Sequence, residues 1–204
     1  MNTDSGIICF QHCHSSVFCK VLPQMCPVCG KKLEQSNVIP FRMPFPFVRA
    51  GQTPCAILIK PSSGDFLNCY SVDSDLHIGI TNSDCVIVEY YAKGLCNTNT
   101  DLWNECLIVY QLKNDSWCHR WNSVLKLISD HIRFSSEKYD EDNFNCYSFV
   151  LEFVQQLDHE DFKASSKTKE MFCNKLVIPR LSEAYKYILL FRSIKNEDCV
   201  VKSG

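Results

Sequence analysis

Residues 75–91 read DLHIGITNSDCVIVEYY, and this stretch decides the architecture of the larger part of the chain. Apolar and polar residues alternate along its first half, which is typical of a half-buried strand. A three-residue connection over 82–84 keeps the apolar side chains of both strands on one face. The same register sets His77 directly opposite Glu89, where the carboxylate can orient the imidazole. The stretch therefore predicts an antiparallel hairpin that carries a polar pair.

The residues around this hairpin predict a mixed domain. Apolar runs indicate strands at 55–60 and 106–112, and helical spacing indicates helices at 115–128, at 146–157 and from Ser182 onward. Strands followed by helices are typical of the α+β class rather than of a parallel α/β sheet. We expect one α+β domain over residues 55–200, with an antiparallel sheet and packed helices.

The composition excludes several classes of protein. The chain has 204 residues, 46% of them hydrophobic, and its net charge of -2 leaves no basic excess for binding nucleic acid. It contains no apolar run of the roughly 20 residues that a membrane span requires, and its first residues do not resemble a secretion signal. We expect a cytoplasmic protein, with the nucleus as an alternative, whose 14 cysteines are reduced.

Residues 1–36 form a Cys/His-rich head, which a proline-rich connector at 37–54 joins to the rest of the chain. The sharpest motif in the head is CPVCG at 26–30, because two thiolates separated by two residues can bind one tetrahedral zinc ion. The glycine permits a positive φ, so that backbone N–H groups can point at the sulfurs. The alternative, a redox dithiol, would need a helix after the motif. We expect a small zinc-binding knuckle or ribbon in which the metal has a structural role.

The zinc ion needs two further ligands from the head. We predict Cys13 and Cys19 in addition to Cys26 and Cys29, with His12 as the alternative to either. A short hairpin that joins 17–18 to 21–22 would bring them close. Because neighbouring residues of a strand face opposite sides, His12 and Cys13 should not both bind one ion.

A candidate nucleophile stands at the predicted start of the helix at 146–157. Asn145 is a good N-cap, which makes Cys146 the first helical residue, where free N–H groups and the helix dipole favour a thiolate. A thiolate that faces His77, itself oriented by Glu89, is the arrangement of cysteine nucleophilic catalysis. Cys85 lies on the predicted His77 face and is the alternative nucleophile.

Two motifs of this domain resemble circularly permuted papain-like thiol enzymes, namely the lecithin–retinol acyltransferase-like and PPPDE families. The motifs are His77-Ile78-Gly79-Ile80 and Asn145-Cys146-Tyr147-Ser148-Phe149. The resemblance implies a permuted papain-like fold and a cysteine hydrolase acting on a peptide, isopeptide or acyl bond, with Cys146 as nucleophile and His77 as base. The acyltransferase-like enzymes often carry histidine where Glu89 stands here, which favours thiol hydrolysis over acyl transfer.

Nearly the whole chain also resembles the makorin-two opposite-strand family, which implies no activity. The shared segments are FQHC at 10–13, CPVCG at 26–30, SDLHIGITN at 74–82, NCYS at 145–148 and VIPR at 177–180. The alternative function is therefore a catalytically inactive, zinc-containing adaptor that binds a partner protein through its papain-like domain.

Overall fold

The computed structural model describes residues 6–98 and 100–203 and divides into two compact units. The first unit comprises the chain up to residue 46 together with residues from 185 onward, and the second comprises 47–184. A long helix, α4 (Ile178–Glu197), passes from the second unit into the first.

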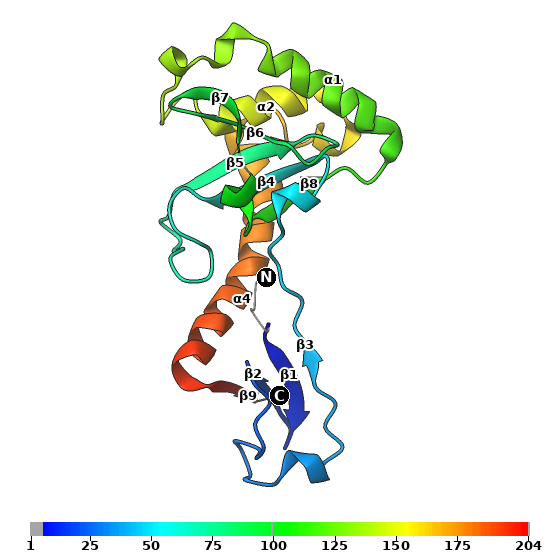
Figure 1. Cartoon of the computed structure of the whole chain (residues 1–204), viewed down its shortest axis with the longest axis vertical. Coiled ribbons are helices and arrows are strands. Elements are labelled where there is room, and N and C mark those ends of the chain that lie inside the picture. The colour runs from blue at the N-terminus through cyan, green and yellow to red at the C-terminus, as the bar shows by residue number, and fades with distance from the viewer. Residues whose placement is uncertain (1–5, 99, 204) are drawn as a thin grey trace. The chain divides into compact units, whose positions relative to one another are not determined.

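The second unit is built on a five-stranded sheet with the order β7-β6-β5-β4-β8 (Figure 1). All of its paired strands are antiparallel, which confirms the predicted sheet type. The strands are β4 (Ala56–Pro61), β5 (Leu76–Thr81), β6 (Ile87–Tyr91), β7 (Gly94–Thr98) and β8 (Leu107–Gln111).

The β5–β6 hairpin differs from the prediction in its register. Glu89 pairs with Gly79 rather than with His77. The connecting turn lies one residue later than expected, because Asn82 still belongs to the ladder: its N–H donates to the Val86 carbonyl at 3.0 Å. Cys85 ends the turn in the left-handed region, with φ of 61°. A three-residue loop whose last residue is left-handed is a common hairpin connection.

Helices cover one face of this sheet, namely α1 (Cys118–Ser129) and α2 (Cys146–Leu157) (Figure 1). An edge-to-face chain of aromatic rings joins Tyr90 of β6 to Phe134 and then to Phe149 of α2. Fully buried isoleucines of β4 and β5 lie on the same face as Tyr90, since side chains alternate along each strand. This face therefore forms the core between the sheet and the helices.

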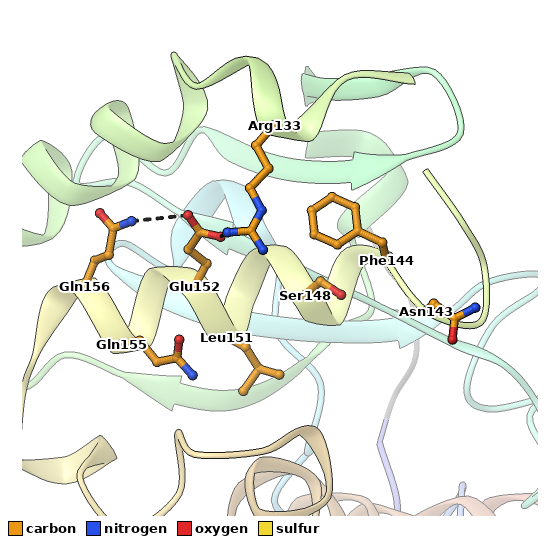
Figure 2. A pocket seen from close by; sticks show the side chains of 8 residues that line it. All are labelled: Arg133, Asn143, Phe144, Ser148, Leu151, Glu152, Gln155 and Gln156. Atoms are coloured by element: carbon orange, nitrogen blue, oxygen red, sulfur yellow. Dashed lines mark hydrogen bonds and ion pairs between the residues drawn. The ribbon is translucent and has the colours of Figure 1, made fainter. Parts of the chain in front are cut away.

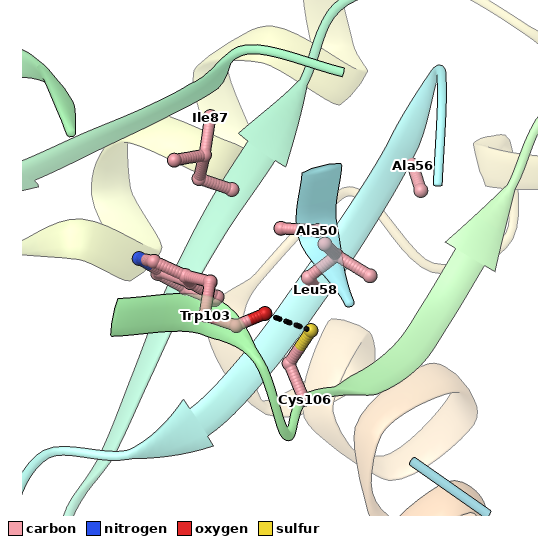
Figure 3. Packing of buried hydrophobic residues seen from close by; sticks show 6 residues of the cluster. All are labelled: Ala50, Ala56, Leu58, Ile87, Trp103 and Cys106. Carbon is pink, nitrogen blue, oxygen red and sulfur yellow. Dashed lines mark hydrogen bonds between the residues drawn. The ribbon is translucent and has the colours of Figure 1, made fainter. Parts of the chain in front are cut away.

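The opposite face of the sheet carries a smaller apolar cluster around Trp103. Its indole packs against Leu58 and Ile87, with Ala50, Ala56 and Cys106 completing the cluster (Figure 3). Trp103 is fully buried, and its ring centroid lies 5.9 Å from that of His77. The Trp103 cluster therefore supports the strand that presents His77.

The remaining helical segments of the described residues are short. In chain order they are 3₁₀ turns at Leu33–Gln35, Ala50–Gln52, Thr100–Trp103, Asp115–Trp117, Ile132–Phe134, Ser136–Lys138 and Glu160–Phe162, then α3 (Lys169–Phe172) and a π-helical turn at Cys173–Val177. The prediction that Ser182 caps the last helix was wrong, because the chain is already helical from Lys169 and Ser182 lies inside α4. No helix within the described ranges has the length and apolarity needed to cross a bilayer.

The first unit contains a four-stranded antiparallel sheet with the order β3-β1-β2-β9. Its strands are β1 (Ile8–His12), β2 (Ser15–Cys19), β3 (Phe41–Arg42) and β9 (Cys199–Ser203). The head hairpin therefore turns at Cys13 and His14, both with positive φ, and does not join 17–18 to 21–22 as predicted. The core of this unit contains Phe10 and Val17.

The unit boundaries also differ from the expected domains 1–36, 37–54 and 55–200. β3 lies within the predicted connector, and β9, at the end of the chain, pairs along its whole length with β2. Both strands belong to the first unit. The difference arises because pairing between strands so distant along the chain leaves no local pattern in the sequence.

Candidate functional site

His77 and Glu89 form a close, mostly buried pair in the second unit. The His77 Nε2 and Glu89 Oε2 atoms lie 2.7 Å apart, with 14% and 9% of the two side chains exposed. The two residues are diagonal neighbours on one face of the hairpin, and the residue directly opposite Glu89 is Gly79. Gly79 has no side chain, and an added Cβ there would lie 3.1 Å from both Ile87 and Trp103. The predicted contact is thus present, although the predicted register is not.

Cys146 occupies the first position of α2, as the sequence indicates. Asn145 is the N-cap, and its Oδ1 accepts a hydrogen bond from the Tyr147 N–H at 3.0 Å, while Ser148 Oγ accepts one from the Asn145 N–H at 3.2 Å. The Asn145 Nδ2 also donates to the Glu141 carbonyl at 2.6 Å. These bonds form a capping box and hold the start of the helix, with Cys146 only 5% exposed.

The His77 ring contacts both Cys146 and Glu89. Burial of the ring lowers the pKa of His77, but hydrogen bonds to Cys146 and then to Glu89 outweigh burial and raise that pKa to about 9. His77 is therefore largely protonated at neutral pH. A protonated imidazole beside a cysteine sulfur and a carboxylate can donate a proton to a leaving group and, once neutral, can accept a proton in a later step.

A cavity of about 660 Å³ opens beside this pair of residues. Both His77 and Cys146 line it, together with Tyr139, Lys60, Lys169 and Cys173. Its volume is sufficient for a small ligand or for one residue of a peptide. Cys146 is thus mostly buried, but it borders this cavity, where a ligand could reach it.

The alternative nucleophile, Cys85, lies elsewhere. It ends the turn after β5, whereas His77 is the second residue of that strand. Cys85 does not line the cavity that His77 and Cys146 share.

A second cavity, of about 500 Å³, follows the outer side of α2. Its charged groups are paired with one another, since Arg133 Nη1 lies 2.7 Å from Glu152 Oε2 and Gln156 Nε2 donates to Glu152 Oε1 at 3.3 Å (Figure 2). Neither histidine nor cysteine lines this cavity. It therefore offers binding space but no nucleophile paired with a base.

The first unit contains a cluster that could hold a metal ion: His12, Cys13, Cys26 and Cys29. One ligand atom from each of the four residues lies within 4.8 Å of the others. The His12 Nδ1 lies 3.0 Å from the Cys13 sulfur, 3.1 Å from that of Cys26 and 3.7 Å from that of Cys29. Tetrahedral zinc with nitrogen and sulfur ligands needs about 3.6 Å between such atoms. The four residues fit this requirement after small outward shifts of two sulfurs.

The backbone of the CPVCG motif turns as a metal knuckle requires. Gly30 has φ of 71°, and the Val28 N–H donates to the Cys26 sulfur at 3.4 Å. A hydrogen bond from the Lys31 backbone lowers the pKa of Cys29. Backbone donors thus point at both sulfurs of the motif, as predicted.

The cluster differs from the predicted ligand set in one member. Cys19 is 1% exposed and packs in the apolar core of the first unit, outside the cluster. His12 and Cys13 both belong to the cluster, so the prediction that they exclude each other was wrong. That argument assumed an extended strand, whereas Cys13 begins the turn with φ of 52° and its side chain departs from the alternation.

Two family models and one curated protein match the chain. A family model described as DUF4796 C-terminal matches residues 40–194, and one described as DUF4796 N-terminal matches residues 5–33. The "MKRN2 opposite strand protein" of Homo sapiens is 31% identical over 207 residues, which cover 94% of this chain and 86% of the human protein. No solved structure matches the chain. The predicted resemblance is confirmed: the chain belongs to the makorin-two opposite-strand (DUF4796) family.

Proposed function

We propose that the second unit is a cysteine hydrolase that cleaves a peptide, isopeptide or acyl bond. The observation that carries this proposal is the single imidazole, His77, which is hydrogen-bonded to Glu89, shares a cavity with Cys146 and has its pKa raised by that thiol. A nucleophile, a base and an orienting group in contact are the minimum for thiol catalysis. The order of these residues along the chain supports the permuted papain-like arrangement that the sequence motifs imply.

The reaction would use the three side chains in turn. The Cys146 thiolate attacks the substrate carbonyl and forms an acyl-thioester, while the bond to the leaving group breaks and the protonated His77 gives its proton to that group. His77 then removes a proton from water, whose oxygen attacks the thioester; the C–S bond breaks, the acid is released, and the pair of thiolate and protonated imidazole is restored. Glu89 keeps the imidazole oriented and stabilises its charged form. The Cys146 N–H, at the first helical position, is placed to donate to the developing oxyanion.

Alkylation rates test this proposal, with Cys173 as an internal reference because it lines the same cavity. The full chain is treated with iodoacetamide at pH 7, and each cysteine is followed by mass spectrometry. We expect Cys146 to react at least about tenfold faster than Cys173, and His77→Ala to remove that advantage. Equal rates for the two cysteines in the folded wild-type chain would refute the hydrolase.

We propose that the cluster in the first unit holds structural zinc. Histidine nitrogen with three cysteine sulfurs is a common ligand set for structural zinc, and so small a sheet gains much of its stability from a bound metal. Free thiol ligands suit a reducing compartment, which agrees with the cytoplasmic location that we also propose.

Metal analysis of the purified chain tests the zinc site and its ligands. We expect about one zinc per chain, which Cys26→Ser and Cys13→Ser lower and Cys19→Ala leaves unchanged. Zinc lost on Cys19→Ala but retained on His12→Ala would overturn the assignment in favour of the ligand set predicted from sequence, namely Cys13, Cys19, Cys26 and Cys29.

One observation supports the alternative function, a zinc-containing adaptor. Several large apolar side chains of the first unit are exposed, namely Val21, Met25, Val28, Ile39 and Phe41. Exposed apolar groups of this kind often contact a partner protein. An adaptor requires no thiol reactivity, so the alkylation experiment separates the two functions: equal rates for Cys146 and Cys173 favour the adaptor.

A further inference from the structure

A second pair of thiols lies in the second unit, away from both sites described above. The sulfurs of Cys55 and Cys118 are 3.8 Å apart, although 63 residues separate them along the chain. Cys55 immediately precedes β4, and Cys118 is the first residue of α1. We propose that these two residues form a reversible disulfide when the protein meets a hydroperoxide, and that this bond joins the sheet to the helix layer.

The backbone holds Cys55 in a fixed position. Its N–H donates to the Asn82 carbonyl at 3.1 Å, and its carbonyl accepts from the Leu112 N–H at 3.0 Å. Cys55 also adopts a left-handed conformation, with φ of 48°, which is uncommon for a residue with a side chain. The surrounding strands impose this conformation and keep the Cys55 sulfur directed at Cys118.

Burial and hydrogen bonding differ between the two thiols, and these differences indicate which of them reacts first with the hydroperoxide. The Cys55 S–H donates to the Cys118 sulfur, and Cys55 is buried while Cys118 is half-buried. Burial and then this hydrogen bond raise the pKa of Cys55 to about 12. Cys55 therefore keeps its proton, and Cys118 presents an accessible sulfur lone pair. Cys118 is the thiol that meets the oxidant, and Cys55 is the thiol that resolves the product.

The chemistry balances with a hydroperoxide as the only oxidant. The Cys118 sulfur attacks the peroxide, so that an S–O bond forms, the O–O bond breaks and the alcohol or water leaves with the thiol proton. The Cys55 sulfur then attacks the Cys118 sulfur. An S–S bond forms, the S–O bond breaks, and the Cys55 proton leaves with the hydroxide as water. The sulfurs must approach from 3.8 Å to about 2.05 Å, which side-chain rotation at the start of α1 can supply.

The cross-link would act on stability rather than on the proposed active site. It closes a loop that contains β4 to β8, and it lies near the end of β5 remote from His77. Constraining so long a loop in the unfolded chain raises the thermal midpoint by roughly 5–15 °C. The alkylation rate of Cys146 should not change, so this inference and the hydrolase can fail independently.

The test uses the zinc-loaded full chain treated with hydrogen peroxide and then mapped by mass spectrometry with differential alkylation. We expect a Cys55–Cys118 disulfide that forms about tenfold faster than any cross-link involving Cys173 and that dithiothreitol reverses. The thermal midpoint should rise on oxidation in the wild type and in Cys85→Ser, the matched control at the neighbouring turn, and should not rise in Cys118→Ser.

Two results would overturn the inference. One is a Cys118 that oxidises to sulfinic acid while Cys55 remains a free thiol. The other is a cross-link map in which Cys55 pairs with Cys118 no more often than with other cysteines. The cross-link map is measured on the wild-type chain, so it tests the proposed disulfide even if Cys118→Ser fails to fold.

Discussion

Replacing Glu89 with glutamine should lower the pKa of His77 and weaken the pH dependence of stability. The change keeps a hydrogen-bond acceptor 2.7 Å from Nε2 but removes the negative charge. In the wild type, contacts with Cys146 and Glu89 raise the pKa of His77 to about 9, whereas in the unfolded chain it is about 6.5. Because the folded-state pKa is the higher one, the stabilisation is complete below pH 6.5 and is lost as the pH rises through 9.

The magnitude follows from that difference. A rise in the pKa of His77 from 6.5 to about 9 corresponds to roughly 3 kcal/mol of stability at low pH, to which Cys146 and Glu89 both contribute. Cys146 is the larger cause, so Glu89→Gln should remove about 1 kcal/mol, and the folded-state pKa of His77 should fall by about one unit.

Histidine ring resonances in NMR spectra recorded from pH 5 to 10 measure the pKa directly, and urea unfolding at several pH values measures the stability. The control is Glu152→Gln, which removes a carboxylate paired with Arg133 outside the cavity of Cys146 and should leave the titration of His77 unchanged. The reasoning is refuted if His77 titrates near 6.5 in the wild type, or if its titration is the same in Glu89→Gln.

Three further changes test other parts of the structure. Asn145→Ala removes the cap of α2, so we expect unfolding free energy to fall by about 1 kcal/mol in urea titrations and Cys146 alkylation to slow severalfold. Gly79→Val adds a side chain whose Cβ alone would lie 3.1 Å from Trp103. We expect the free energy of unfolding, measured in urea, to fall by about 1–3 kcal/mol. An unchanged free energy of unfolding would mean that the Trp103 cluster can rearrange to accept the valine. Removal of zinc with a chelator should increase the rate of amide hydrogen exchange in the sheet of the first unit and leave the rate in α2 unchanged. An equal increase in both units would contradict this expectation.

The hairpin illustrates what residue patterns do and do not specify. Alternation along 76–81 determines which side chains share a face, because a strand has a period of two. It does not determine register: a slip of two residues keeps every side chain on its face, and the observed register differs from the predicted one by such a slip. His77 and Glu89 meet in both registers because a diagonal pair on one face is also within reach. The Asn82 Oδ1 accepts hydrogen bonds from the Asp84 and Val86 N–H groups and so favours the observed turn. Alternation along the strand does not reveal these bonds.

The metal cluster shows the same limit. CPVCG is a local motif whose turn geometry depends on a few adjacent residues, and so it was predictable. The choice among His12, Cys13 and Cys19 depended on where β1 ends and which side chains enter the core. The strand alternation that we applied fails in a turn with positive φ.

The sequence by itself determined the α+β class, the antiparallel hairpin, the knuckle and the cap that places Cys146 at a helix start. Each of these depends on neighbours within a few residues, whose sterics and hydrogen bonds act locally. Only the tertiary structure decided that β9 joins the first unit, that His77 contacts Cys146, and that Cys55 lies against Cys118. Such contacts join segments far apart in the chain, and packing of the whole core selects them among many apolar pairings that the sequence pattern allows equally.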